Sequence, residues 1–312
     1  NKTEDGSTVY YYSGNTTNNW VKFGGFYWRI IRTNEDGSIK MLYVGSSHDT
    51  VNGLNEYSKV SYNSSSSVSP HYVGYMYGNY VSLAKSRLNT HNSTIKTVID
   101  TWYKNNLLTN YDKYISKTAI YCNDRSVGSG KYNTSATNFK YATNVRIQNM
   151  IPTYKCGGDG NGGLFESTQA VEDKFSVSTS GGGNGQLTYP IALMTADEIA
   201  FAGGTLSTEN KIVWYLTNSN GVSVFNNNNA SGSWWTMSPS AYTKSGNYMN
   251  VSMMSVSYLG NIGNAIEISS TSTEYVRFAI SLKSCVEYLS GNGTPESPYE
   301  VTIDDTCASA EN

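Results

Sequence analysis

The chain has 312 residues, which is long enough for one large domain or two small ones. Its 22 Lys and Arg residues against 24 Asp and Glu residues give a formal net charge of −2, so we expect no nucleic-acid partner. Only 15% of the residues are charged while 13% are aromatic, and a disordered chain has the opposite bias. No run of 18 apolar residues occurs, so we expect no membrane-spanning segment in this sequence.

The first predicted elements are strands. Val9–Tyr12 is a short β-branched and aromatic run, and residues 19–45 contain two stretches in which apolar side chains alternate with others. Asn34–Gly37, between these stretches, has the composition of a hairpin turn. The Ser- and Asn-rich residues 46–70 show no periodicity, and we expect them to form a surface loop.

Helices are predicted in the middle of the chain. Ser93 is a candidate N-cap for a helix that ends near Leu107, because apolar residues then recur at helical spacing. Thr195 and Glu198 form a capping box for a second helix, which the glycine pair at 203–204 should end. A third, weaker helix is expected within Ala136–Met150.

Short strands dominate the pattern after residue 211. The candidates are Ile212–Leu216, Met249–Val256, Ile266–Ile268 and Val276–Leu282. Strands at both ends with helices between them indicate an α+β fold whose terminal strands meet. We expect residues 1–284 to form one domain and residues 285–312 to form a C-terminal extension tethered by a disulfide. The predicted core comprises Trp28, Ile30, Ile99, Trp102, Ile199, Phe201, Trp234, Val276 and Ile280.

The four cysteines favour a location outside the cell. An even number with wide spacing and no CxxC pattern is typical of two disulfides and excludes a zinc ribbon. Of the three possible connectivities, pairing of sequence neighbours predicts Cys122–Cys156 and Cys285–Cys307. Four free buried thiols are the alternative.

No catalytic pattern is found in the sequence. The three histidines, His48, His71 and His91, are far apart, and no known nucleophile, phosphate-binding or zinc pattern occurs. Asp197 and Glu198 fit better as acidic residues of a first helical turn than as a catalytic pair. A calcium loop at 159–162 lacks most of its ligand positions. We therefore expect a protein that is not an enzyme and has no cofactor and no metal.

Residues 233–283 have the composition of a binding surface. Trp234–Ser240 reads as an aromatic anchor followed by a proline turn, and the next stretch is rich in Asn, Ser, Thr, Tyr and Met. Tyrosine gives contact area at low entropic cost, while Ser and Asn give adaptable hydrogen bonds. A plain polar surface around a β core is the alternative interpretation.

Eight segments, in order along most of the chain, resemble a family of exported proteins from gut Firmicutes and mollicute-like bacteria. They are Val21–Gly45, Val73–Gly78, Ser93–Leu107, Tyr121–Val127, Leu187–Gly204, Trp234–Ser240, Tyr275–Ser284 and Gly291–Val301. The succession of segments is also similar to the C-type-lectin-like group, which includes formylglycine-generating-enzyme-like domains and the variable proteins of diversity-generating retroelements. That group usually closes on Gly-Val-Arg-Pro, and here Tyr275 and Phe278 replace the Gly and the Pro.

The resemblance implies a C-type-lectin-like fold with short twisted antiparallel strands, two or three helices and long polar loops. It implies a ligand-binding, adhesin-like protein on the bacterial surface or on a pilus, whose partner is a protein or glycan, with pilus or cell-wall components as further candidates. A structural filament subunit is the alternative, and a formylglycine-generating-enzyme-like oxidoreductase is a more remote one.

In such a fold the stretch after Trp234–Ser240 displays residues on one solvent-facing surface. The part of the gene that encodes this stretch is a candidate for diversification by a retroelement. Met249, Val251, Met254 and Val256 are expected to point inward. The predicted ligand-binding residues are Ala241, Tyr242, Thr243, Lys244, Asn247, Tyr248, Asn250, Ser252, Ser255, Ser257, Tyr258, Asn261, Asn264 and Glu267. The three tyrosines should anchor the ligand, since aromatic residues dominate binding hot spots.

Overall fold

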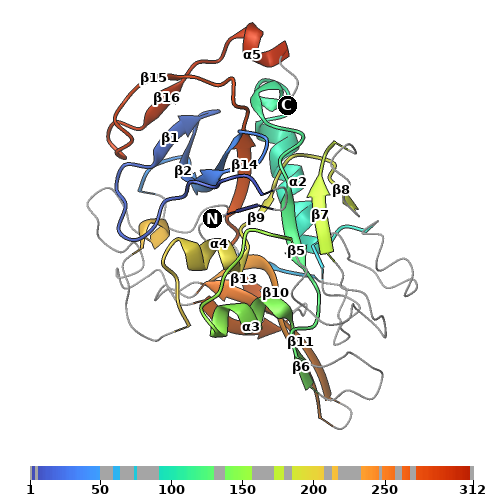
Figure 1. The fold of residues 1–312 in the computed structure, drawn as a ribbon. Coiled ribbons are helices and arrows are strands. Elements are labelled where there is room, and N and C mark those ends of the chain that lie inside the picture. The colour runs from blue at the N-terminus through green and yellow to red at the C-terminus, as the bar shows by residue number, and fades with distance from the viewer. Residues whose placement is uncertain are drawn as a thin grey trace.

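A computed structural model gives the fold of the chain (Figure 1). It describes residues 2–3, 6–49, 59–63, 74–75, 91–129, 138–156, 172–178, 185–206, 213–216, 233–245, 248–256, 262–267 and 272–309. Over these residues the protein is α+β, with more strand than helix, as the sequence predicts.

The largest layer is a seven-stranded sheet with the order β15-β16-β1-β2-β3-β14-β9. Its strands are β1 (Trp20–Phe23), β2 (Phe26–Thr33), β3 (Ile39–Gly45), β9 (Ala192–Leu193), β14 (Phe278–Leu282), β15 (Tyr288–Ser290) and β16 (Tyr299–Val301). Strands from the two ends of the chain therefore share one sheet. The expectation that the terminal strands meet is confirmed.

The N-terminal strands differ in number from the prediction. Residues 20–45 form three strands rather than two, because Gly24 and Gly25 adopt φ values of 63° and 82° and turn the chain tightly between β1 and β2. A hairpin turn of this kind requires positive φ at both central residues, which glycine adopts without steric cost. The predicted strand at Val9–Tyr12 is wrong, since only Tyr11 makes an isolated bridge, to Arg32.

The C-terminal segment joins the same sheet. β16 pairs in parallel with β1, with Val21 opposite Tyr299, and β15 pairs with β16 at the edge. The short helix α5 (Asp305–Ser309) follows, and the disulfide Cys285–Cys307 ties it to the end of β14. Backbone pairing as well as the disulfide thus holds this segment to the rest of the molecule.

The predicted helices are confirmed, with their caps. The helix α2 (Thr94–Asn106) begins after Ser93, whose hydroxyl accepts a hydrogen bond from the backbone N–H of Lys96. Its buried face packs into the core, because Ile95, Ile99 and Tyr103 lie one turn apart on one side. The third helix, α3 (Ala142–Gln148), lies within its predicted range, although residues 138–140 before it form a strand.

The helix α4 (Ala196–Phe201) has the predicted capping box. The hydroxyl of Thr195 accepts from the backbone N–H of Glu198, and the Glu198 carboxylate accepts from the backbone N–H of Thr195. The helix ends at Ala202, and Gly203 follows with φ 108°. Two donors at the helix start are thereby satisfied within the segment itself.

The remaining strands form three smaller sheets. One has the order β12-β11-β10-β6, and the others are β5-β7-β8 and β13-β4. Their bounds are β4 (Val60–Ser61), β5 (Tyr121–Asp124), β6 (Asn138–Lys140), β7 (Glu172–Ser176), β8 (Gly185–Gln186), β10 (Trp234–Ser245), β11 (Tyr248–Val256), β12 (Ile262–Glu267) and β13 (Thr273–Glu274). Of the strands predicted after residue 211, β11 and β14 are confirmed, and β12 begins earlier than expected.

Three local predictions are wrong. Residues 214–216 form the 3₁₀ helix η4 (Trp214–Leu216) instead of a strand, and a second such helix, η2, spans Asp112–Tyr114. Residues 59–63 are not a surface loop, because β4 pairs with β13 and Tyr62 is fully buried. Pro239 does not end its segment in a turn. It lies inside β10 at a register irregularity, where a proline can interrupt the hydrogen-bond ladder.

One contiguous core joins these layers across the described residues. Six of the predicted core side chains are buried: Trp28, Ile99, Ile199, Trp234, Val276 and Ile280. The other three, Ile30, Trp102 and Phe201, are half-buried. Trp102 still stacks on Phe278, with ring centroids 4.4 Å apart, so it closes the core rather than facing solvent.

The end of α3 has an unusual residue. Met150 has φ 57°, a left-handed conformation in which glycine is usual. The backbone N–H of Met150 bonds to the carbonyl of Ile147, and the N–H of Ile151 bonds to the carbonyl of Arg146. This pair of bonds is the Schellman ending of a helix. A side chain at its left-handed position costs roughly 1–2 kcal/mol relative to glycine.

Candidate functional site

The predicted binding segment forms a hairpin that projects from the body of the molecule (Figure 1). Its strands, β10 and β11, lie between β12 and β6 in the four-stranded sheet. Near the tip of the hairpin, Tyr242 of β10 is opposite Phe139 of β6, and Thr243 is opposite Asn138. Successive residues of a strand point to opposite faces, so this register sorts the predicted residues into two groups.

One group faces outward. Thr243 is exposed and Ala241 is half-exposed, whereas the half-exposed Lys244 alternates to the side of Tyr242. Asn138 and Lys140 on the adjoining strand β6 are exposed as well, at register positions opposite Thr243 and Ala241. We call Asn138, Lys140, Ala241 and Thr243 the β6–β10 face.

The other group is buried and corrects the prediction. Tyr242 is only 5% exposed, because its ring packs against Phe139 with centroids 5.3 Å apart. Ser255 and Ser252 are also buried. Ser252 is in register with Ala241, and its hydroxyl donates to the carbonyl of Ala241. These three side chains were expected to be exposed and are instead buried.

The expected inward residues are partly confirmed. Met254 and Val256 are fully buried. The side chains of Met249 and Val251 lie outside the described part of the chain. The same holds for the other predicted ligand-binding residues, namely Asn247, Tyr248, Asn250, Ser257, Tyr258, Asn261, Asn264 and Glu267.

Sequence analysis missed the contribution of β6. Asn138 and Lys140 fall in a region read as weak helix, and three residues carry too little periodicity to identify a strand. Their pairing with β10 spans about a hundred residues of sequence. Only a hydrophobic residue between two polar ones, Phe139, gives a signal of an edge strand with one buried face.

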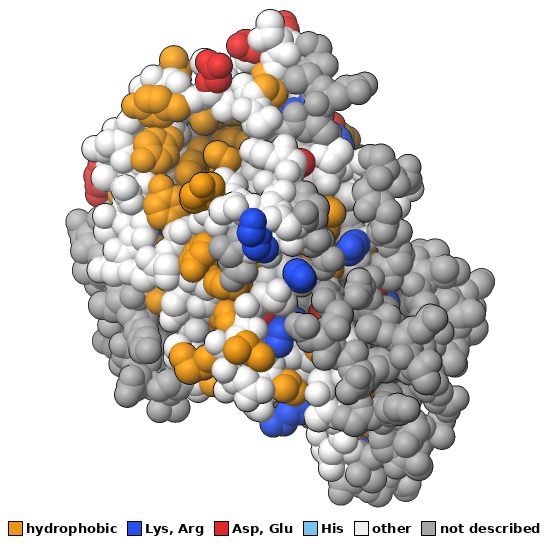
Figure 2. Space-filling model, in the orientation of Figure 1, with side chains coloured by type: hydrophobic (Ala, Val, Ile, Leu, Met, Phe, Trp, Pro, Cys, Tyr) orange, Lys and Arg blue, Asp and Glu red, His pale blue; other side chains and the backbone are white. Residues whose placement is uncertain are grey.

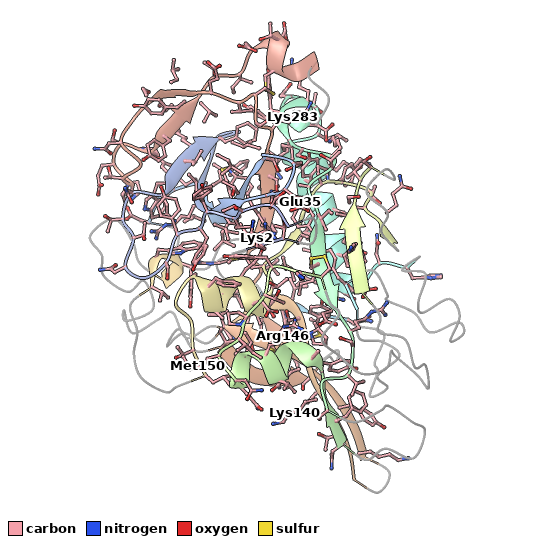
Figure 3. The ribbon with its side chains drawn as sticks, in the orientation of Figure 1. Lys2, Glu35, Lys140, Arg146, Met150 and Lys283 are labelled. Carbon is pink, nitrogen blue, oxygen red and sulfur yellow. A yellow bond between two sulfur atoms is a disulfide. The ribbon has the colours of Figure 1, made fainter. Side chains whose placement is uncertain are left out.

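The hairpin rests on α3, and a buried ion network fixes that helix. The Asn144 side chain donates to the Ser240 hydroxyl of β10 at 2.8 Å. Arg146 donates to Asp124 of β5 at 2.6 Å and to both carboxylate oxygens of Asp197 at 2.9 and 3.0 Å. Burial lowers the pKa of Arg146, but the two carboxylates outweigh it and the net shift is upward. Arg146 therefore stays charged and holds β5, α3 and α4 together (Figure 3).

A second buried network lies beside the first. Glu198 accepts from Arg32 at 2.9 Å and from Lys40 at 2.6 Å, and all three side chains are nearly inaccessible. Burial raises the pKa of Glu198, but the cations of Lys40 and Arg32 outweigh that effect and lower the pKa to about 2. The carboxylate that also completes the capping box of α4 is therefore ionised at neutral pH.

These networks enclose little space for chemistry. The cavity between Arg32, Asp124, Arg146, Asp197 and Glu198 measures about 10 Å³, which is roughly the volume that one water molecule needs. Each of these side chains already has a partner of opposite charge. The structural interpretation of Asp197 and Glu198, as acids of a first helical turn, is thus the better one.

All four cysteines form disulfides, and both predicted pairs are confirmed. Cys122 of β5 bonds to Cys156 beyond α3, and Cys285 bonds to Cys307 of α5. The first disulfide closes a loop that contains α3 and β6. It therefore holds the support of the β6–β10 face by a covalent bond in addition to the ion network.

Comparison of the chain with protein-family models found no match, and comparisons with curated proteins and with solved structures also found none. Within the described residues, no three His, Cys, Asp or Glu side chains are grouped in a way that could hold a metal ion. The helices in the same residues are all too short or too polar to cross a membrane. Two disulfides are compatible with an extracellular protein.

Proposed function

We propose that this protein is a ligand-binding, adhesin-like protein of the bacterial cell surface or a pilus, and that the β6–β10 face is the described part of its binding surface. The observation that supports this most is the register at the tip of the projecting hairpin. Tyr242 and Phe139 fill the inner side of the sheet, so Thr243 and Asn138 are left on the outer side. Because the buried side of the hairpin is packed, its exposed side can present polar side chains while the fold stays stable.

The proposal includes a C-type-lectin-like fold. Two features support it: terminal strands that share one sheet, and a separate smaller sheet that carries the candidate face. The resemblance of the eight sequence segments supports it as well. Diversification of the exposed positions is part of the proposal, and a reverse transcriptase gene with a near-copy of the coding region for residues 234–283 beside this gene would support it.

The ligand class follows from the chemistry of the face. Thr243 and Asn138 offer neutral hydrogen-bonding groups, and Lys140 adds positive charge. The predicted anchors Tyr248 and Tyr258 would add aromatic contact area. Neutral hydrogen-bonding groups with aromatic platforms suit a glycan or a polar protein surface.

The formylglycine-generating-enzyme-like alternative has less support. Chemistry of that kind would need cysteine sulfur available to a metal or a substrate, and both disulfides occupy the four cysteines. The filament alternative does not conflict with a binding role, because a subunit can carry a binding face.

The experiment replaces Tyr248, Tyr258 and Thr243 by Ala and measures binding to glycan and protein arrays, adhesion to cells and the melting temperature. We expect binding to fall by about tenfold or more with an unchanged melting temperature, since truncated hot-spot residues cost roughly 2 kcal/mol or more. The control is Tyr10→Ala, which removes an exposed tyrosine elsewhere on the molecule. Unchanged adhesion in the triple variant would place the binding site elsewhere.

A further inference from the structure

A groove lies between α3 and α4, apart from the β6–β10 face. It measures about 350 Å³ and is lined by Ile147, Met150, Pro152, Ala200 and Leu206 together with Gln148, Gly204 and Thr205. No charged side chain occurs among the described residues that line it. A concave apolar site of this size is large enough to receive one or two apolar side chains.

Two large apolar side chains are exposed beside this groove. Met150 is 77% exposed and Ile151 is 61% exposed. The left-handed backbone of Met150, with φ 57°, holds both residues outside the helix instead of against it. Glycine would fit this position without strain, so the stability of the fold does not explain the methionine. A contact with another molecule would explain it.

The segment that carries α3 is positively charged. Residues 138–155 contain Lys140, Arg146 and Lys155 and no Asp or Glu. Lys140 donates to Gln148 on the groove wall at 3.0 Å, and Lys155 is exposed. Arg146 is already paired, and the acids of α4 are buried in the ion networks. Among the described residues of this segment, the exposed charge is therefore carried by Lys140 and Lys155.

The C-terminal segment has the opposite character. Residues 285–312 contain six acidic residues and no Lys or Arg. Five of the carboxylates are exposed, those of Glu287, Glu296, Glu300, Asp304 and Asp305. Lys113 pairs with Asp305 and Lys22 is in register with Glu300, and the other three exposed carboxylates leave this surface negative.

Exposed apolar side chains lie among these carboxylates. Tyr288 is 63% exposed and Leu289 is 62% exposed, both on the edge strand β15, and Ile303 is 47% exposed. We call β15, β16 and the residues up to Asp305 the acidic hairpin. Its apolar residues within a negative rim are the complement of an apolar groove within a positive rim.

The two surfaces lie at opposite ends of the molecule. β15, β16 and α5 are at one end, and α3, with Met150 and Lys140, is toward the other (Figures 1 and 3). Figure 2 shows several Asp and Glu side chains at the first end, while the larger patches of Lys and Arg lie across the middle of the view and below it. One copy of the chain cannot bring its own two surfaces together.

We propose that the acidic hairpin of one copy docks on the α3–α4 groove of a second copy. The contact is heterologous, because two different surfaces meet, so repetition of it gives either a closed ring or an open chain of subunits. Opposite charge on the two rims favours this pairing over contacts between like surfaces. Lys140 belongs to the β6–β10 face and also contacts the groove wall, but Thr243 belongs to neither docking surface, so ligand binding and self-association can be lost separately.

Sedimentation velocity of the purified chain, over a concentration series, tests the proposal. We expect self-association that weakens as salt rises from about 0.1 M to about 1 M, because the screening length falls from about 10 Å to about 3 Å. Met150→Gly and Leu289→Ser should each weaken association by about tenfold or more, as loss of a central apolar contact does. Tyr10→Ala, another exposed residue, should leave it unchanged.

Charge reversal gives the sharper test. One double variant is Lys140→Glu/Lys155→Glu, and the other is Glu287→Lys/Glu300→Lys. Each should be monomeric alone, because its changed surface repels the unchanged surface of another copy. A one-to-one mixture should associate, because the two changed surfaces again carry opposite charges. Restoration in the mixture supports the heterologous contact. A wild-type chain that is monomeric at every concentration and salt, or a mixture that stays monomeric while the wild type associates, would overturn it. Association that only anionic vesicles induce would also overturn it, and would assign the groove to a membrane.

Discussion

Tyr242 of β10 and Phe139 of β6 lie opposite each other on the inner side of one sheet, with ring centroids 5.3 Å apart. The contact joins a strand predicted to bind ligand to a strand that sequence analysis did not identify. It gives the hairpin a buried side and leaves Thr243 and Asn138 on the exposed side.

Replacement of Tyr242 therefore tests stability rather than binding. Tyr242→Ala should lower the free energy of unfolding by about 3 kcal/mol, as truncation of a buried aromatic side chain does. Thr243→Ala, one residue away on the exposed side, should change it by about 0.5 kcal/mol or less. Chemical denaturation of both variants makes the comparison. Equal effects would mean that the register of β10 and β6 is wrong.

Local signals in the sequence predicted the parts of the fold that depend on neighbouring residues. Ser93 and Thr195 cap their helices because a hydroxyl needs only a backbone N–H two or three residues away. The sequence analysis missed the turn at Gly24–Gly25, although a glycine pair is typical of a tight hairpin turn. The cysteine pairs were predicted correctly because sequence neighbours happen to pair.

Long-range pairing limited the rest of the prediction. β4 pairs with β13 across more than two hundred residues, and nothing in its own composition marks it as a strand. The same reason explains the error at Tyr242 and Ser255, because strand alternation gives two faces but does not say which of them a distant strand or helix will cover.

The Glu198 network should control stability in acid. Glu198→Gln leaves the buried cations Arg32 and Lys40 without their carboxylate, and should cost about 3–5 kcal/mol. The pKa of Glu198 is lowered to about 2 from an ordinary value of 4.5, so its contribution is complete above pH 4.5 and is lost as pH falls towards 2. The shift corresponds to about 3 kcal/mol.

Denaturation of the wild type and of Glu198→Gln at several values between pH 7 and pH 2 measures this contribution. It is the difference between the unfolding free energies of the two proteins at each pH. The difference in unfolding free energy should shrink as pH falls through this window, because only the wild type takes up the proton. A constant difference across the range would show that folding does not shift the pKa of Glu198.

Met150→Gly should stabilise the fold slightly. Relief of the left-handed strain gains roughly 1–2 kcal/mol, and the greater freedom of glycine in the unfolded chain offsets about 0.4–1 kcal/mol of that. A net rise of about 0.5 kcal/mol is expected, measured by thermal and chemical denaturation. The same change should weaken self-association, so stability and association move in opposite directions. A variant that loses both would show that Met150 supports the fold itself.

Removal of the second disulfide should act locally. Cys285→Ser/Cys307→Ser opens a loop with a sequence separation of 22, for which chain entropy gives about 3 kcal/mol. We expect hydrogen exchange to rise in α5 while β16 stays protected, since β16 pairs with β1. Loss of protection in β1 as well would show that the covalent link, and not the strand pairing, holds the C-terminal segment.

The parallel pairing of β16 with β1 also has a mechanical consequence. A pulling force that enters before Trp20 and leaves after Val301 draws the two strands past each other along their length. Their hydrogen bonds, together with the one from the Trp20 N–H to the carbonyl of Gly293 between β15 and β16, then resist the load together instead of breaking one at a time. A load applied across these two strands would therefore be resisted by shear of their hydrogen bonds, and the part of the fold between them would stay folded until this pairing gives way.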